Sequence, residues 1–142
     1  MEQRDFIKDE IERLGRVLGK IVADFLGTNS PGLVEHSIQI SQEQLKGELD
    51  IDVNALLVLD TKDLIEYLVN RNLTFGHFEQ LALFLKEVGL HELDRDKRKA
   101  KNYLVRSLDL LNAADEISRS ASFERMELKS SINGLLQHCV DR

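Results

Sequence analysis

Apolar residues recur at alternating spacings of four and three over the first part of the chain. The series is Ile7, Ile11, Leu14, Leu18, Ile21 and Phe25. A repeat that averages 3.5 residues places one apolar line along an α-helix, and it is typical of coiled coils and helix bundles. The spacing therefore predicts a first helix over about 2–26 that packs this line against other helices.

A row of small residues runs beside the apolar line at a constant spacing of four. Its members are Gly15, Gly19, Ala23 and Gly27. Because a glycine inside a helix costs about 1 kcal/mol relative to alanine, the row needs a compensating interaction. We expect another helix to approach closely along it. We also expect Gly27 to end the first helix in a left-handed conformation.

The rest of the chain also has the apolar spacing and the capping residues of helices. Capping residues precede the apolar segments and can accept a hydrogen bond from the first turn of a helix, and they are Asp52, either Asp60 or Thr61, Thr74 and Ser122. We expect Gly89 to end the most apolar of these helices, and a helix with a charged first half to follow over about 93–117. Little of the sequence resembles a β-strand.

These segments predict an all-α fold of six to seven helices, arranged as a helical bundle or as a tetratricopeptide-like helix-hairpin array. The chain of 142 residues has room for one domain, which we place over 1–142. Within it we expect the first helix over about 2–26, a second helix from Pro31 to about Leu49, and a helix-hairpin region over about 60–142.

Two stretches in the second half have the pattern of a helix pair in which small residues face large ones. They are Gln80–Leu85 and Ala100–Leu104, the latter followed by Ser107 and Leu108. With Asp5–Ile7 near the start and Ser122–Arg125 near the end, the chain resembles a group of small bacterial all-helical proteins related to tetratricopeptide repeats. The resemblance implies a helical scaffold for protein–protein interaction, and it carries over no catalytic residues.

The charge balance is acidic, with 25 Asp and Glu against 19 Lys and Arg and a net charge of −6. Because neutralising phosphates requires a basic surface, this balance argues against a general nucleic-acid binder. We interpret the local basic run Arg95–Lys101 as a solvated helix face, and the alternative is a docking point for an acidic partner or RNA. The apolar runs are far shorter than the roughly 20 residues of a membrane helix, so we expect a cytoplasmic protein with no membrane partner.

Residues that could carry out chemistry are scattered along the chain. No two of the four histidines are spaced i, i+4, and the single cysteine, Cys139, excludes an intramolecular disulfide and a multi-cysteine zinc site. His91 and Glu92 resemble the start of a zinc-protease motif, but Arg95 stands where that motif requires a second histidine. We therefore expect no enzyme activity, no catalytic residue, no cofactor and no bound metal.

We interpret the chain as a non-enzymatic helical protein-interaction or scaffold module whose partner is another protein or a second copy of itself. The first helix carries this interpretation, because surplus apolar surface along it can pair with a second copy and form a symmetric homodimer. The contact residues that we expect are Ile7, Ile11, Leu14, Gly15 and Leu18.

An alternative function is the binding of a small ligand, or an enzyme activity, in a pocket between helices. The residues that we expect near such a pocket are Phe75, His77, Phe78 and Tyr103. Among these residues, His77 is the best polar candidate for contacting a ligand. A ligand that stabilises the protein, with an effect that depends on His77, would favour this alternative.

Overall fold

The computed structural model describes residues 2–28 and 31–139, and these residues form seven helices and no strands. The helices are α1 (Glu2–Leu26), α2 (Pro31–Leu49), α3 (Val53–Val58), α4 (Thr61–Val69), α5 (Phe75–Glu92), α6 (Lys97–Ser118) and α7 (Phe123–Gln137). The predicted all-α fold of six to seven helices is confirmed. None of the helices in the described ranges combines the length and the apolar character needed to cross a membrane.

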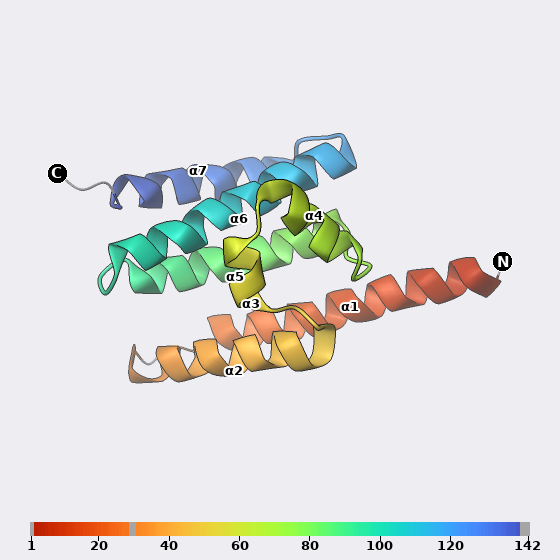
Figure 1. Ribbon diagram of the computed structural model, residues 1–142, viewed down its shortest axis with the longest axis horizontal. Coiled ribbons are helices and arrows are strands. Elements are labelled where there is room, and N and C mark those ends of the chain that lie inside the picture. Colours follow the sequence, from red (N-terminus) through yellow and green to blue (C-terminus); the bar gives the residue numbers. More distant parts are fainter. Residues whose placement is uncertain (1, 29–30, 140–142) are drawn as a thin grey trace.

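The long helices lie side by side around a central pair, α5 and α6 (Figure 1). α1 packs against one side of this pair and carries α2 on its own outer side, while α7 covers α6 on the other side. The short helices α3 and α4 cross the long ones and connect α2 to α5. The molecule is therefore a layered helical array whose core lies on both faces of α5.

Small residues allow α5 and α6 to approach each other closely. A Cβ added at Gly89 would lie 2.9 Å from side-chain atoms of Leu104. Ala82 and Ser107 are also fully buried, and the Ser107 hydroxyl donates a hydrogen bond of 2.6 Å to the Ala82 carbonyl. Ala82, Leu104 and Ser107 lie within the two sequence stretches that predicted a helix pair with small residues facing large ones, whereas Gly89 lies outside both.

The apolar line of α1 is buried against the rest of the chain from Leu14 onward. Leu18 is fully buried, and the Phe25 ring meets the Phe84 ring of α5 edge-on, with centroids 5.1 Å apart. The first half of the small-residue row faces α5 as well. A Cβ added at Gly15 would lie 3.4 Å from His77 Nε2, and one added at Gly19 would lie 3.3 Å from Gln80 Nε2. The expected close approach of another helix is thus confirmed for these two glycines.

The predicted helix starts agree with the structure. The carboxylates of Asp52 and Asp60 and the hydroxyl of Ser122 each accept a hydrogen bond from a backbone N–H in the first turn of α3, α4 and α7. Thr74 begins α5 in a capping box with His77, in which each side chain pairs with the backbone of the other residue. Local side-chain chemistry therefore sets these four helix starts.

The predicted ends of α1 near residue 26 and of α2 near Leu49 are confirmed, but the expected conformation of Gly27 and the expected helix end at Gly89 were wrong. Gly27 does not adopt a positive φ, and the left-handed residues of the described chain are Asp50, Asn72 and Arg119, with φ of 55°, 65° and 56°. Gly89 does not end α5, because it lies inside the helix against α6, and α5 continues to Glu92. The next helix starts at Lys97 rather than near residue 93, since the Asp96 carboxylate accepts hydrogen bonds from the first-turn N–H groups of α6.

Side chains at the end of α4 hold the left-handed residue that ends α2. Arg71 donates from Nε to the Asp50 carbonyl at 2.5 Å and from Nη2 to the Asp50 carboxylate at 3.3 Å. The Arg71 guanidinium also lies 3.5 Å from the centroid of the Tyr67 ring. The Tyr67 hydroxyl in turn accepts a hydrogen bond of 2.8 Å from the Asp52 N–H. This cluster positions the link between α2 and the short helices.

Candidate functional site

The N-terminal part of α1 extends beyond the neighbouring helices (Figure 1). Ile7 is 57% exposed and Ile11 is partly exposed, whereas Leu14 and Leu18 are 5% and 0% exposed. The apolar line therefore continues past the point where the core of the chain covers it. We call the described part of this extension, residues 7–13, the α1 arm.

The structure narrows the set of residues predicted to contact a partner. Ile7 and Ile11 have surface that a second chain could reach. Leu14 and Leu18 are buried in the core, and Gly15 lies against His77 of α5, so these three residues attach α1 to its own chain. The sequence pattern could not separate the two groups, because all five residues follow the same periodicity.

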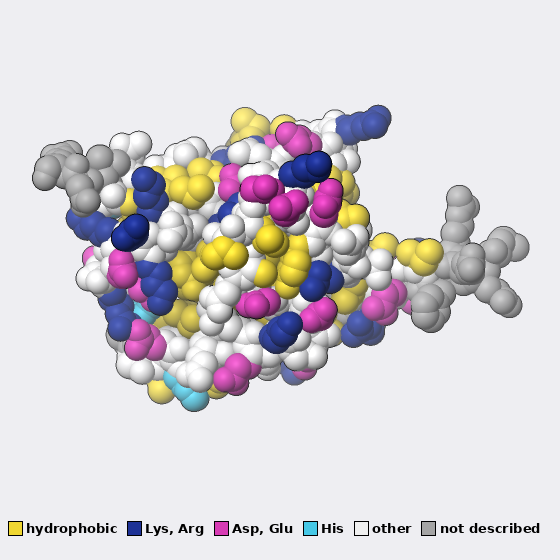
Figure 2. All heavy atoms as spheres, in the orientation of Figure 1, with side chains coloured by type: hydrophobic (Ala, Val, Ile, Leu, Met, Phe, Trp, Pro, Cys, Tyr) yellow, Lys and Arg dark blue, Asp and Glu magenta, His cyan; other side chains and the backbone are white. Residues whose placement is uncertain are grey.

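Acidic and basic side chains lie beside apolar ones at the base of the projecting part of the molecule, as Figure 2 shows for one face. Arg13 and Glu10 form an ion pair of 2.9 Å, and the hydrogen bond from Arg13 lowers the pKa of Glu10. Across residues 7–16 the basic and acidic residues balance. They are Lys8, Arg13 and Arg16 against Asp9, Glu10 and Glu12.

His77 marks the place where the arm leaves the body of the molecule. Its Nδ1 accepts a hydrogen bond of 2.8 Å from the Thr74 N–H, so the ring proton is on Nε2, which donates to the Ile11 carbonyl at 3.1 Å. Burial lowers the pKa of His77, and the hydrogen bond to Ile11 opposes this shift. The imidazole is therefore a neutral connector between α1 and the start of α5.

The four residues of the predicted ligand pocket lie in different surroundings. Phe78 is fully buried, Phe75 is 43% exposed, and His77 faces α1. Tyr103 instead faces α2, and its hydroxyl accepts a hydrogen bond of 3.3 Å from the Gln42 amide. Tyr103 thus belongs to a different part of the surface from His77.

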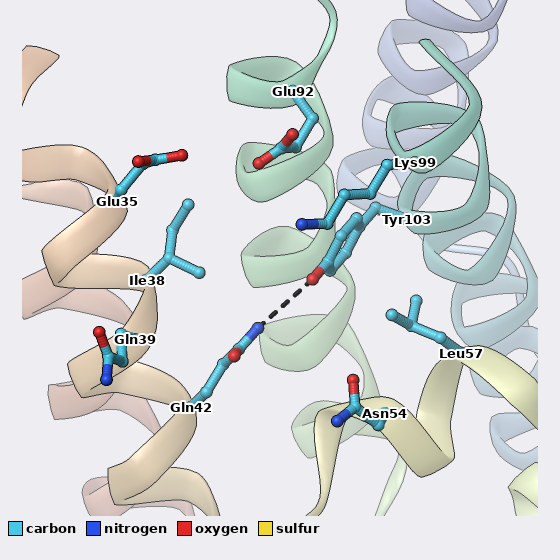
Figure 3. Close-up of a pocket in the computed structure, with 9 residues that line it drawn as sticks. All are labelled: Glu35, Ile38, Gln39, Gln42, Asn54, Leu57, Glu92, Lys99 and Tyr103. Carbon is cyan, nitrogen blue, oxygen red and sulfur yellow. Dashed lines mark hydrogen bonds between the residues drawn. The ribbon is translucent and has the colours of Figure 1, made fainter. Parts of the chain in front are cut away.

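Tyr103 lies in an open hollow between α2, α3 and α6, with a volume of about 310 Å³ (Figure 3). The lining is mostly polar, and its side chains come from four helices. They are Glu35, Ile38, Gln39, Gln42, Asn54, Leu57, Glu92, Lys99 and Tyr103. Burial raises the pKa of Tyr103, the charge of Glu92 adds to this effect, and the hydrogen bond from Gln42 opposes it.

Three potential metal-ligating side chains lie close together at one end of the hollow, which Glu35 and Glu92 line and His91 does not. They are Glu35 from α2 and the neighbours His91 and Glu92 at the end of α5, whose ligating atoms all lie within 4.8 Å of one another. Arg95 forms an ion pair with Glu35 and a contact of 3.3 Å with His91 Nε2. Sequence reasoning noticed His91 and Glu92 but missed Glu35, because no local motif relates α2 to the end of α5.

The other candidate residues from the sequence are exposed, cap helices or lie beside the core. The charged residues of the basic run Arg95–Lys101 are exposed, while Asp96 within it caps α6. Cys139 is half-buried beside the core, and burial raises the pKa of its thiol. Asp52 and Asp60 cap helices, as predicted.

Comparison with known proteins adds no relative: no family model, no curated protein and no solved structure matches this chain.

Proposed function

We propose that this chain is a non-enzymatic helical interaction module that associates with a second copy of itself through the α1 arm. The observation that carries the proposal is the continuation of the apolar line beyond the chain's own core. Ile7, which is 57% exposed, and Ile11 follow the same spacing as the buried residues Leu14 and Leu18. A coiled-coil seam that extends past its own core offers a helix-sized surface to another helix.

Charge favours a second copy as the partner. The protein has a net charge of −6, so two copies repel each other over most of their surfaces. The arm carries a net charge of only −1, with Lys8 and Arg13 against Asp9, Glu10 and Glu12, and Arg16 in the following turn offsets it. In an antiparallel pair related by a twofold axis, Ile7 of one copy packs against Ile11 of the other, which completes two apolar layers.

The size of the arm predicts a weak and reversible dimer. A contact over two or three helical turns falls in the class below about 1,200 Å² of buried surface, where transient complexes are found. Sedimentation velocity over a wide range of protein concentration is therefore the appropriate measurement. We expect the average sedimentation coefficient to rise with concentration toward that of a dimer.

A matched pair of variants tests the contact. Ile7→Glu places a charge in the proposed seam, and Val58→Glu places one on α3 at a site that is 79% exposed and outside the arm. We expect Ile7→Glu to remain a monomer at all concentrations while Val58→Glu behaves like the wild type. A wild-type protein that is monomeric throughout, or equal association by both variants, contradicts the proposal.

The alternative function, binding of a small ligand, is favoured by one observation, the polar hollow at Tyr103. Its volume of about 310 Å³ is at the lower end for small-molecule sites. A thermal-shift screen of polar metabolites on the wild type and on Tyr103→Phe tests it. Stabilisation by one compound that Tyr103→Phe reduces supports a ligand site there, and stabilisation by none of the compounds counts against it.

A further inference from the structure

The end of the hollow at Glu35, His91 and Glu92 carries an inference that does not depend on self-association. We propose that these three side chains form a binding site for a divalent first-row transition-metal ion, with Zn²⁺ as its natural probe. Two carboxylates and one imidazole are a donor set that such ions accept. The imidazole nitrogen argues against Mg²⁺ and Ca²⁺, which prefer oxygen ligands.

Glu92 is the residue that most clearly requires a partner. It is 7% exposed, and no hydrogen bond or ion pair reaches its carboxylate from the described residues. Figure 3 shows this carboxylate pointing into the hollow, on the side where Glu35 projects from α2. The carboxylate oxygens open onto the hollow, where a cation could reach them and neutralise their charge.

The Nε2 lone pair of His91 is directed at Arg95, which a bound metal ion would have to displace. Arg95 Nη1 lies 3.3 Å from His91 Nε2, and a guanidinium can only donate hydrogen bonds. Nε2 is therefore the acceptor, which is the form of histidine that binds a metal ion. The Arg95 guanidinium also pairs with Glu35, so a positive charge lies between two of the three proposed ligands.

Small movements would complete the coordination. Zinc binds nitrogen and oxygen at about 2.0–2.2 Å in tetrahedral geometry, so two ligand atoms on one ion are about 3.3–3.6 Å apart, and the side chains would have to close by about 1 Å. The ligating atoms of the cluster lie within 4.8 Å of one another. Glu35 and Arg95 are 58% and 47% exposed at their side chains, so Glu35 can move inward while Arg95 moves out to solvent. Three protein ligands leave the remaining positions to water.

The site would also join two helices that have little direct contact. α2 packs mainly on α1, and it reaches the α5–α6 pair through side-chain contacts such as Gln42 with Tyr103. A metal ion held by Glu35 on one side and by His91 and Glu92 on the other would connect α2 directly to α5. Binding to the folded chain alone raises its stability, so the melting temperature should rise with Zn²⁺ concentration.

Isothermal titration of the full, tag-free chain with ZnCl₂, after removal of metals by a chelator, tests the proposal. We expect one Zn²⁺ per chain and no comparable binding of Mg²⁺. Glu92→Gln should weaken Zn²⁺ binding by more than about tenfold, since even losing an outer-shell partner of a metal ligand costs about 10–100-fold. This variant removes a buried charge at constant shape, so the fold should be preserved, and circular dichroism checks this.

Two further variants separate the proposed site from non-specific binding. Arg95→Ala removes the competing cation and should tighten Zn²⁺ binding several-fold. His36→Ala removes an exposed histidine on α2 that is not in the cluster, and it should leave the affinity unchanged. The proposal is overturned if neither the wild type nor Arg95→Ala binds Zn²⁺, or if Glu92→Gln binds as tightly as His36→Ala. Ile7→Glu should bind Zn²⁺ normally, which separates this test from that of self-association.

Discussion

The imidazole of His77 donates from Nε2 to the backbone carbonyl of Ile11, 3.1 Å away, and so connects the first turn of α5 to α1 where the arm begins. The Ile11 carbonyl lies inside α1 and accepts a hydrogen bond within that helix, so His77 is its second donor. The same ring accepts the Thr74 N–H through Nδ1. The neutral His77 side chain therefore pairs with a backbone N–H at the start of α5 and also attaches α1 to α5.

The neutral state of His77 predicts a pH dependence of stability. Its pKa is lowered by burial, whereas the unfolded chain has the ordinary value near 6.5. Between these two pKa values the unfolded chain binds more protons, so the free energy of unfolding falls as the pH falls below about 6.5. His77→Gln keeps an acceptor for the Thr74 N–H but cannot titrate. Urea unfolding from pH 7 to 5 should show a smaller loss in this variant, and equal losses would contradict the prediction.

The apolar line of α1 has an exposed part and a buried part, so shortening a side chain to alanine should affect stability differently in the two parts. Leu18→Ala removes a fully buried side chain and should lower the free energy of unfolding by about 2–5 kcal/mol. Ile7→Ala truncates a side chain that is 57% exposed, and it should change stability by less than about 0.5 kcal/mol. Urea unfolding at a concentration where the protein is a monomer measures both. Similar losses would mean that the core also covers Ile7.

The close contact between α5 and α6 at Gly89 predicts opposite effects of two glycine substitutions. Gly89→Ala places a methyl group 2.9 Å from the Leu104 side chain and should destabilise the protein by about 1–3 kcal/mol. Gly134, inside α7, has nothing within 4 Å of the position that a Cβ would occupy. Gly134→Ala should therefore stabilise the protein by about 0.5–1 kcal/mol. Thermal unfolding of both variants decides whether the signs differ.

Arg125 holds α7 on the α5–α6 pair and predicts a large effect of its removal. It is 5% exposed, donates to Asp115 at 2.6 Å and also pairs with Glu79 of α5. Arg125→Met should lower the free energy of unfolding by about 1–3 kcal/mol, because the carboxylates of Asp115 and Glu79 lose a charged hydrogen-bond donor. Arg98→Met, on the exposed face of α6, is the control and should be nearly neutral. A neutral Arg125→Met would show that this network adds no stability.

Most helix starts could be predicted from the sequence because their cause is local, although the equally local cap at Asp96 was missed. Asp52, Asp60 and Ser122 act on backbone groups two or three residues away, and that distance is visible in a sequence. The helix ends could not be predicted equally well. Gly89 is a glycine because Leu104 lies against it, and not because a helix ends there. Contacts between distant residues determined that position.

The same distinction applies to the candidate sites. The periodicity of α1 identified Ile7 and Ile11, but only the packing of α5 separates them from Leu14 and Leu18. The cluster of Glu35 with His91 and Glu92 has no local signature at all. Its two parts lie on different helices, and the connection through α3 and α4 brings them together.

The packing of α1 against α5 also has a consequence for synthesis of the chain. Proteins are made from the N-terminus at about 5–20 residues per second, and neighbouring segments can fold as they emerge. α1 leaves the ribosome before α5, and Phe84 and the other residues of α5 that cover it follow only after α2, α3 and α4. During that interval α2 can pack on α1, but the face of α1 that α5 covers in the finished fold is still open, so the nascent chain presents an apolar helix face that a chaperone could bind.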